Sequence, residues 1–233
     1  AEEDFWQVFS ADLIERYGRR IDNRCELEIR PLMAQHPAAR RRVLRSFLGQ
    51  LHGYLSAIEE KHITLVEGLI AGNRPQADID LPGIWVARRY QRLLCAESAP
   101  VCPEFELWID REGEYELPSG QRLQVVLGKL LREEEPDNEA VFFDADKIRF
   151  PLIVRSPRPG DRFRPSGMNG TKLLKDYFVD AKIEREDRQR TALICAGDEI
   201  LWLAGQRRCD LYCPVPGENA LKLRLVNSEL SFE

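Results

Sequence analysis

Residues 155–182 read RSPRPGDRFRPSGMNGTKLLKDYFVDAK, and along this stretch the predicted structure changes from strand to helix. Its first half is rich in proline and glycine, which favour turns and interrupt regular elements. Glycine also lets the backbone turn tightly or approach a ligand closely. A strand-like run ends at Val154, and a helix is expected from about Thr171 to Ala181. An arginine-rich loop therefore separates the two elements.

The predicted helix carries one apolar stripe and two charged flanks, since successive residues are about 100° apart around a helix. The apolar stripe, which should be core, contains Leu174, Tyr177, Phe178 and Ala181. The basic flank contains Lys172, Lys175 and Lys182, and the acidic flank contains Asp176 and Asp180. A helix whose charges separate by sign presents a basic edge that can follow a phosphate backbone.

Arginines extend this basic character on both sides of the helix. The arginines of the loop and of the segment after the helix are Arg155, Arg158, Arg162, Arg164, Arg185, Arg188 and Arg190. A guanidinium group can hold two phosphate oxygens at once, so such a cluster favours RNA binding. The alternative is a solvated face whose charges pair internally, for example Arg162 with Asp161 or Asp176.

The rest of the chain divides into three stretches by hydrophobic pattern. Residues 1–76 predict a helical domain: helices are expected over about 5–14, from Pro37 to about Ile58, and from about Ile63 to a stop at Gly72. Residues 77–147 predict a β-rich connecting segment of short antiparallel strands, including a hairpin around Pro82-Gly83. Residues 148–233 predict a C-terminal α+β domain.

Further strands are expected in the second and third stretches, at 105–109, 123–127, 141–143, 148–154, 192–195, 200–204 and 221–226. Among the tryptophans, Trp85, Trp108 and Trp202 lie in these strand-like runs and are predicted to be core, whereas Trp6 lies on a helix face. The fold class is therefore α+β: an N-terminal helical domain, a small antiparallel β segment and a C-terminal α+β domain.

Composition describes an ordinary water-soluble protein with uneven charge. Of the 233 residues, 43% are hydrophobic and 31% are charged, and the formal net charge is −5. The middle stretch has eight basic and 16 acidic residues, a net of −8, whereas 148–233 has 15 and 12, a net of +3. Phosphate binding depends on the local patch and not on the overall balance, so the chain's acidity does not exclude RNA.

No apolar run approaches the roughly 20 residues that cross a bilayer, and there is no secretion leader, so we expect a cytoplasmic protein without a membrane partner. The six cysteines are scattered and form no CxxC pair, which favours reduced thiols. Neither composition nor motif decides between a monomer and a homodimer.

Several motifs of the second half resemble the C-terminal domain of the bacterial tRNA(Ile)-lysidine synthase family. In chain order they are Phe143-Asp-Ala-Asp146, Pro151-Leu-Ile-Val-Arg155, Gly160-Asp-Arg-Phe163, Leu174-Lys-Asp176, Lys182, Arg188 and Leu201-Trp-Leu-Ala-Gly205. The family's ATP-binding loop, Ser-Gly-Gly-x-Asp-Ser, does not occur in the sequence. The resemblance therefore implies the RNA-handling part of a ligase, without the catalytic domain that binds ATP and Mg²⁺.

The resemblance also implies a substrate and candidate contacts. The family attaches lysine to C2 of the wobble cytidine (C34) of an isoleucine tRNA with a CAU anticodon, and its C-terminal domain holds the acceptor-stem region. The tRNA-binding candidates carried over to this domain are Arg155, Arg158, Arg162, Arg164, Lys172, Lys175, Lys182 and Arg188. A weaker match at Pro37-Ala-Ala-Arg-Arg-Arg-Val-Leu-Arg45 resembles the family's linking domain and adds Arg41, Arg42 and Arg45.

Other chemistry is less favoured. We expect no catalytic residue and no metal site: Asp144 and Asp146 lack a third ligand, and His36, His52 and His62 lack a catalytic context, which favours capping, packing or surface roles. Two rival functions stay open at this stage. One is a protein-interaction module that uses the acidic middle stretch, and the other is a self-contained enzyme that uses Asp161, Lys175 and Asp176 as an acid–base set.

Overall fold

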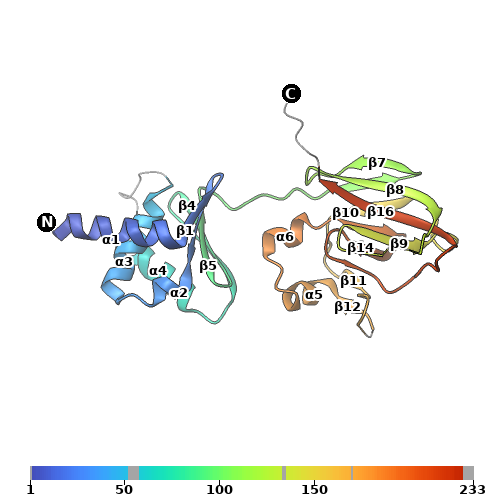
Figure 1. The fold of residues 1–233 in the computed structure, drawn as a ribbon. Helices are drawn as coiled ribbons and strands as arrows, with labels where there is room; N and C mark the ends of the chain where they lie inside the picture. The colour runs from blue at the N-terminus through green and yellow to red at the C-terminus, as the bar shows by residue number, and fades with distance from the viewer. Residues whose placement is uncertain (1, 52–57, 133–134, 169, 228–233) are drawn as a thin grey trace, which may run out of the picture. The chain divides into compact units, whose positions relative to one another are not determined.

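The computed structural model describes residues 2–51, 58–132, 135–168 and 170–227. The chain forms two compact units, Ala1–Val101 and Cys102–Glu233, which we call the N-terminal unit and the C-terminal unit (Figure 1). Each unit combines helices with antiparallel sheets, which confirms the α+β fold class. The boundary falls inside the stretch 77–147, so the residues expected to form one connecting segment are divided between the two units.

The helices of the N-terminal unit begin at recognisable signals. They are α1 (Glu2–Tyr17), α2 (Ile29–Met33), α3 (Pro37–Gly49) and α4 (Glu60–Ala71). The predicted start of α3 at Pro37 is confirmed, and the side chain of His36 caps it by accepting the Ala38 N–H at 3.3 Å. His62 completes a capping box with Glu59 at the start of α4. These two histidines therefore stabilise the first turns of α3 and α4.

The helix predicted from Pro37 to Ile58 ends earlier than expected. Gln50 caps α3, and its N–H donates to the carbonyl of Phe47 at 3.2 Å in a tightened last turn. Residues 52–57, which include His52 and Gly53, lie outside the described part of the chain. The predicted stop of the next helix at Gly72 is confirmed, since Gly72 is the C-cap of α4.

A five-stranded antiparallel sheet completes the N-terminal unit. Its order is β1 (Gly18–Ile21), β2 (Arg24–Glu28), β5 (Arg92–Ala96), β4 (Ile84–Arg89) and β3 (Gln76–Leu81). The hairpin predicted around Pro82-Gly83 is confirmed as β3–β4, with Gly83 at φ 73°. Only helices were predicted within 1–76, and the structure adds the strands β1 and β2 there. The two strands pair with each other in a short hairpin, and β2 joins the rest of the sheet through β5, which is distant in sequence.

The helices of this unit share one core with the sheet. Leu13 of α1, Phe47 of α3 and Ile63 of α4 pack in one cluster with Leu27 of β2 and Leu93 of β5. Side chains alternate between the faces of a strand, so the residues between these positions stand on the other face of the sheet. That second face carries a small cluster of its own around Trp85 and Leu94.

The C-terminal unit is built on two antiparallel sheets. One has the order β15 (Arg207–Arg208), β14 (Glu199–Leu203), β13 (Leu193–Ala196), β10 (Leu152–Arg155) and β6 (Glu106–Ile109). The other has the order β7 (Gly113–Glu116), β8 (Gln121–Lys129), β16 (Asn219–Asn227) and β9 (Ala140–Asp144). The hairpin of β11 (Arg162–Phe163) and β12 (Lys172–Leu173) and the helices α5 (Leu174–Asp180) and α6 (Arg185–Arg190) complete the unit.

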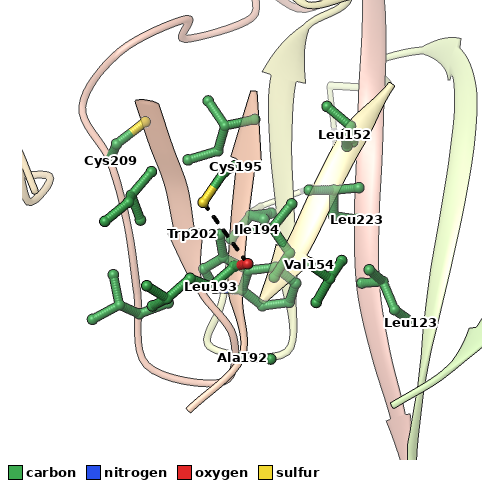
Figure 2. Packing of buried hydrophobic residues seen from close by; sticks show 14 of the residues in the cluster. Leu123, Leu152, Val154, Ala192, Leu193, Ile194, Cys195, Trp202, Cys209 and Leu223 are labelled. Carbon is green, nitrogen blue, oxygen red and sulfur yellow. Dashed lines mark hydrogen bonds between the residues drawn. The ribbon is translucent and has the colours of Figure 1, made fainter. Parts of the chain in front are cut away.

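The core of the C-terminal unit draws side chains from both sheets. Leu123 and Leu223 of one sheet join Val154 and Leu193 of the other in a single cluster (Figure 2). Trp202 is fully buried in this cluster, and the thiol of Cys195 donates to the carbonyl of Leu193 at 3.9 Å. All six cysteines of the chain are free thiols.

Most of the predicted strands of this unit are confirmed, with two corrections. Within 148–154 only Leu152 to Val154 are strand, at the start of β10. Trp85 and Trp202 are buried as predicted. The prediction that Trp108 is a core residue is wrong, since its side chain is 53% exposed. Trp108 lies on the edge strand β6, where the pleat turns the neighbouring Ile109 to the core and Trp108 to solvent.

Candidate nucleic-acid interface

The loop after β10 is anchored by an ion pair between Arg155 and Asp161. The guanidinium donates to both carboxylate oxygens at 2.9 and 2.8 Å, and the Arg158 backbone N–H donates to the same carboxylate at 2.7 Å. The two paired side chains are only about one-tenth exposed (10% and 11%). Burial alone would raise the pKa of Asp161, but the hydrogen bonds from Arg155 and from the Arg158 backbone, together with the charges of both arginines, outweigh it and lower that pKa.

Arg155 is therefore committed within the fold. Its guanidinium also donates to the carbonyl of Ser156 at 3.0 Å. The hydrogen bond to Asp161 raises the pKa of Arg155. A buried guanidinium held in this way shapes the loop and presents no free fork to a ligand.

A short hairpin precedes the helix and delays its start. The pairs of β11 and β12 are Arg162 with Leu173 and Phe163 with Lys172. The Leu174 N–H donates to the carbonyl of Asp161 at 2.8 Å, so the chain is still extended where the sequence predicted a first helical turn from Thr171. The buried ring of Phe163 packs edge-to-face on Tyr177, at 5.7 Å between ring centroids. The packing of Phe163 on Tyr177 and the pairing of β11 with β12 therefore stabilise the extended chain more than an additional helical turn would.

This hairpin changes the expected charge pattern of the helix. Leu174, Tyr177 and Phe178 are buried as the apolar stripe predicted, but Ala181 is exposed. The prediction of one flank shared by three lysines is wrong, because only Lys175 lies on α5. Lys172 lies in β12, and its ammonium group pairs with Asp180, which was assigned to the opposite flank.

Lys182 follows α5 in a left-handed conformation. Its φ is 54°, a region that glycine favours and lysine rarely adopts. The Lys182 N–H donates to the carbonyl of Val179 at 3.0 Å and the Ile183 N–H to that of Phe178 at 2.9 Å. This pair of hydrogen bonds is the Schellman motif that ends many helices, usually with glycine where Lys182 stands. The backbone thus holds an exposed lysine at a position that costs conformational energy.

A groove of about 360 Å³ lies between the loop, α5 and α6. Pro157, Leu174 and Phe178 form much of the apolar part of its lining. The positively charged side chains that line it are Arg158, Lys175 and Arg188, and Glu104 adds one negative charge. The guanidinium of Arg188 stacks over the ring of Phe178 at 6.0 Å and donates to the carbonyl of Ile183 at 2.8 Å. A groove lined by both apolar and cationic side chains suits a base or sugar flanked by phosphates.

The remaining predicted residues of this unit differ in how far they are already engaged. Arg158 pairs with Glu106, which also accepts the indole N–H of Trp108 at 2.9 Å. Arg164 pairs with Asp210 at 2.9 Å. In the described part of the chain, three predicted residues make no side-chain ion pair or hydrogen bond and are exposed, and they are Arg162, Lys175 and Lys182.

The three arginines predicted in the N-terminal unit are each engaged in a contact within that unit. Arg41 pairs with Glu67 at 2.9 Å, and Arg42 pairs with Glu3 at 3.1 Å while lying over the ring of Trp6. Arg45 donates to the carbonyl of Ile58 at 2.7 Å. These pairings lower the net positive charge that α3 presents to an anion.

Sequence reasoning passed over a second group of arginines in this unit. No helix or strand was predicted over 18–30, where Arg19 and Arg24 meet Arg92 of β5 around the buried carboxylate of Glu26. The alternation of Arg24, Glu26 and Glu28 along β2 is the only local signal, and the cluster needs Arg92 from a distant strand.

The residues considered for other chemistry serve structural roles. Asp144 pairs with Lys147 at 2.7 Å and accepts the N–H of Asp146 at 3.0 Å, which is a turn. Among the residues that the structure describes, no group of three His, Cys, Asp or Glu side chains could hold a metal ion. None of the described helices is long and apolar enough to cross a membrane.

Two protein-family models match the chain, one in each unit. The model of the TilS substrate binding domain matches residues 27–94, and the model of the TilS substrate C-terminal domain matches residues 152–225. The chain is thus built from substrate-binding modules and belongs to that class of protein.

Curated relatives give the same family name. The tRNA(Ile)-lysidine synthase of Geobacter sulfurreducens is 35% identical over 173 residues, 72% of this chain and 36% of the relative. That of Geobacillus kaustophilus is 32% identical over 213 residues, 89% of this chain and 46% of the relative. A solved structure titled "Crystal structure of TILS C-terminal domain" is 26% identical, with a TM-score of 0.47, and the match covers 53% of this chain and 98% of that one.

The chain belongs to the tRNA(Ile)-lysidine synthase (TilS) family, of which it carries the substrate-binding and C-terminal domains. The resemblance read from the sequence motifs is confirmed. The chain spans about a third to a half of the length of the curated relatives that it matches.

Proposed function

We propose that this chain is the tRNA-recognising portion of a tRNA(Ile)-lysidine synthase. The observation that carries the proposal is that Arg162, Lys175 and Lys182 stay exposed and unpaired, within the described residues, around one hairpin and helix of a TilS C-terminal domain. Figure 1 shows β11, β12 and α5 next to one another in the C-terminal unit. RNA is read largely through its shape and backbone, which suits cations that are free to meet phosphates.

The chemistry of the whole enzyme follows from the family. It would use ATP to activate C2 of the wobble cytidine of a CAU-anticodon isoleucine tRNA, and lysine would then displace AMP to give lysidine. ATP, Mg²⁺ and lysine would be bound by a catalytic domain outside this chain, in the cytoplasm. The contribution of this chain would be orientation, since holding a large substrate in register can supply several kcal/mol of a barrier.

Neither rival function has comparable support. The acidic stretch 77–147 is divided between the two units, so it does not form one docking surface of a single unit. The rival enzyme would need Asp161 as an acid or base, but its carboxylate already accepts hydrogen bonds from the Arg155 side chain and the Arg158 backbone. The comparisons do not support a protein-interaction module.

The test is a salt-titrated binding curve of the full chain with the CAU-anticodon isoleucine tRNA. The test variant combines Arg162→Glu, Lys175→Glu and Lys182→Glu. Each lost phosphate contact should reduce the slope of log affinity against log salt by about one unit, so three contacts should reduce it by about three. The stoichiometry at saturation also shows whether one copy or a homodimer binds each tRNA.

A matched control removes the same charge elsewhere in the C-terminal unit. Arg111, Lys129 and Arg132 are exposed and lie next to β7 and β8, which Figure 1 shows away from α5. Their triple change to Glu should leave the slope close to that of the unchanged chain. Equal losses in both variants would mean that only total charge matters, and no binding by the unchanged chain would overturn the proposal.

A further inference from the structure

The sheet of the N-terminal unit has one face turned away from its helices, and a compact arginine cluster lies on that face. Cys25 and Leu27 of β2 belong to the core under the helices, so Arg24 and Glu26 point to the opposite side. Cross-strand pairing places Arg19 directly opposite Glu26. Three strands therefore deliver side chains to one point, since Arg92 comes from β5.

The carboxylate of Glu26 is the centre of this cluster and is only 2% exposed. Arg19 donates to its Oε2 through Nε at 2.8 Å and approaches it through NH2 at 2.7 Å, and Arg92 donates to the same oxygen at 2.8 Å. The Arg24 guanidinium lies 2.7 Å from Oε1 without the alignment of a hydrogen bond. Burial would raise the pKa of Glu26, but the hydrogen bond from Arg19 and the charges of Arg92 and Arg24 outweigh it and lower that pKa.

One carboxylate thus holds three guanidinium groups in place and leaves a net charge of about +2. A guanidinium has five N–H donors, and Arg19 directs only two of them at Glu26, while Arg24 lies beside Oε1 without a hydrogen bond to it. The side chains of Arg19, Arg24 and Arg92 are 59%, 30% and 31% exposed, so part of each group faces solvent. The cations are fixed before any ligand arrives, which reduces the entropy cost of binding.

A cavity of about 500 Å³ opens beside the cluster. Arg19, Glu26 and Arg92 line it together with Arg30, which is exposed and makes no side-chain ion pair or hydrogen bond among the described residues. Gly18 also lines it, at the junction of α1 and β1, where a Cβ would lie 2.5 Å from the Ile14 carbonyl oxygen. The space is large enough for a nucleotide-sized group.

We propose that this Glu26-centred arginine cluster, with Arg30, binds a phosphodiester of an RNA backbone. The inference rests on the proposed function and assigns the N-terminal unit its own contact with the tRNA. Guanidinium forks match phosphate oxygens in geometry as well as charge. The arginines of α3 do not form such a cluster, since Arg41 is paired with both Glu60 and Glu67, and Arg42 is paired with Glu3.

The test variant is Arg19→Ala/Arg30→Ala, measured by the same salt titration with tRNA on the full chain. If each arginine neutralises one phosphate, the log–log slope falls by about two units. The matched control is Arg20→Ala/Arg74→Ala, which removes two exposed arginines of the same unit that do not line the cavity. Circular dichroism checks the fold. The single Arg30→Ala change removes no side-chain ion pair or hydrogen bond between residues that the structure describes, and it should lower the slope by about one.

Each outcome distinguishes this inference from the proposed function. An unchanged slope in the double variant and in Arg30→Ala, with tRNA binding intact, overturns the cluster as an RNA site and leaves the C-terminal interface standing. No tRNA binding by the unchanged chain overturns both. Inorganic phosphate and ATP form a further arm: saturable binding of either one to the cluster in the absence of RNA, without competition against tRNA, would assign the site to a free phosphate compound instead.

Discussion

The guanidinium of Arg155 binds both carboxylate oxygens of Asp161 across the loop that precedes the β11–β12 hairpin, at 2.9 and 2.8 Å. The pair joins the end of β10 to the start of the hairpin while both side chains stay about nine-tenths buried. It therefore fixes the entry of the segment that carries Arg162 and Lys175. Arg155 therefore has a structural role in this region, whereas Arg162 and Lys175 are exposed on its surface.

Asp161→Asn should destabilise the C-terminal unit by about 3 kcal/mol, because it leaves the buried Arg155 without a charged partner. Urea unfolding, followed by the exposure of the buried Trp202, measures the change. Asp176→Asn is the control, since Asp176 is exposed and makes no ion pair among the described residues. Equal stability of the two variants would show that the ion pair is dispensable.

The stability of both units should fall as the pH drops through the acid range. The pKa values of Glu26 and Asp161 are lowered in the folded chain from their ordinary values of 4.5 and 3.8. Their stabilising contribution is therefore complete above about pH 5 and is lost as the pH falls through the ordinary values towards the lowered ones. Thermal unfolding between pH 7 and pH 2.5 should show this loss, which should be smaller for the C-terminal unit of Asp161→Asn. An unchanged pH profile in that variant would contradict the assignment.

Lys182→Gly should stabilise the C-terminal unit and weaken RNA binding at the same time. Glycine relieves a left-handed backbone position that costs a side-chain-bearing residue about 1 kcal/mol, while it removes an exposed charge. Thermal unfolding and the tRNA salt titration measure the two effects separately. Lys182→Gln serves as the control that removes the charge and keeps the strain. The interpretation fails if glycine lowers the stability or if neither variant changes the salt slope.

Gly18→Ala should destabilise the N-terminal unit by about 1 to 3 kcal/mol. The added Cβ would lie 2.5 Å from the Ile14 carbonyl oxygen, so the backbone at the junction of α1 and β1 must shift and move the adjacent Arg19 with it. Gly68→Ala in α4 is the opposite control: its Cβ meets nothing within 4 Å, and alanine in an exposed helix should stabilise by about 0.5 to 1 kcal/mol. Similar effects of both changes on the unfolding midpoint would contradict this account.

Local sequence patterns predicted the elements that depend on neighbouring residues. Pro37 opens α3, Gly72 caps α4, and the turn around Gly83 joins β3 to β4 because proline and glycine restrict or widen the backbone at their own positions. The apolar spacing of Leu174, Tyr177 and Phe178 likewise predicted the buried face of α5. These signals operate within a few residues and need no knowledge of the fold.

The errors concern features that distant partners decide. β2 is an inner strand of its sheet because the distant β5 pairs with it, and Trp108 is exposed because β6 is the edge of its sheet. Lys172 lies in β12 and not in the predicted helix, because strand pairing with β11 and the ion pair with Asp180 outweigh the local preference for helix. α6 is short and polar, so its sequence carried no apolar rhythm by which to predict it.

The sequence by itself determined the α+β class, the family and the concentration of positive charge between Arg155 and Lys182, since motifs and composition survive without coordinates. Only the tertiary structure decided which of those charges are free. Arg155 and Lys172 are neutralised by carboxylates, whereas Arg162, Lys175 and Lys182 are exposed and, among the described residues, unpaired. It also assembled the Glu26 cluster from three strands. The sequence specifies which side chains are charged, but the partner and the exposure of each charge depend on which strands and loops the fold brings together.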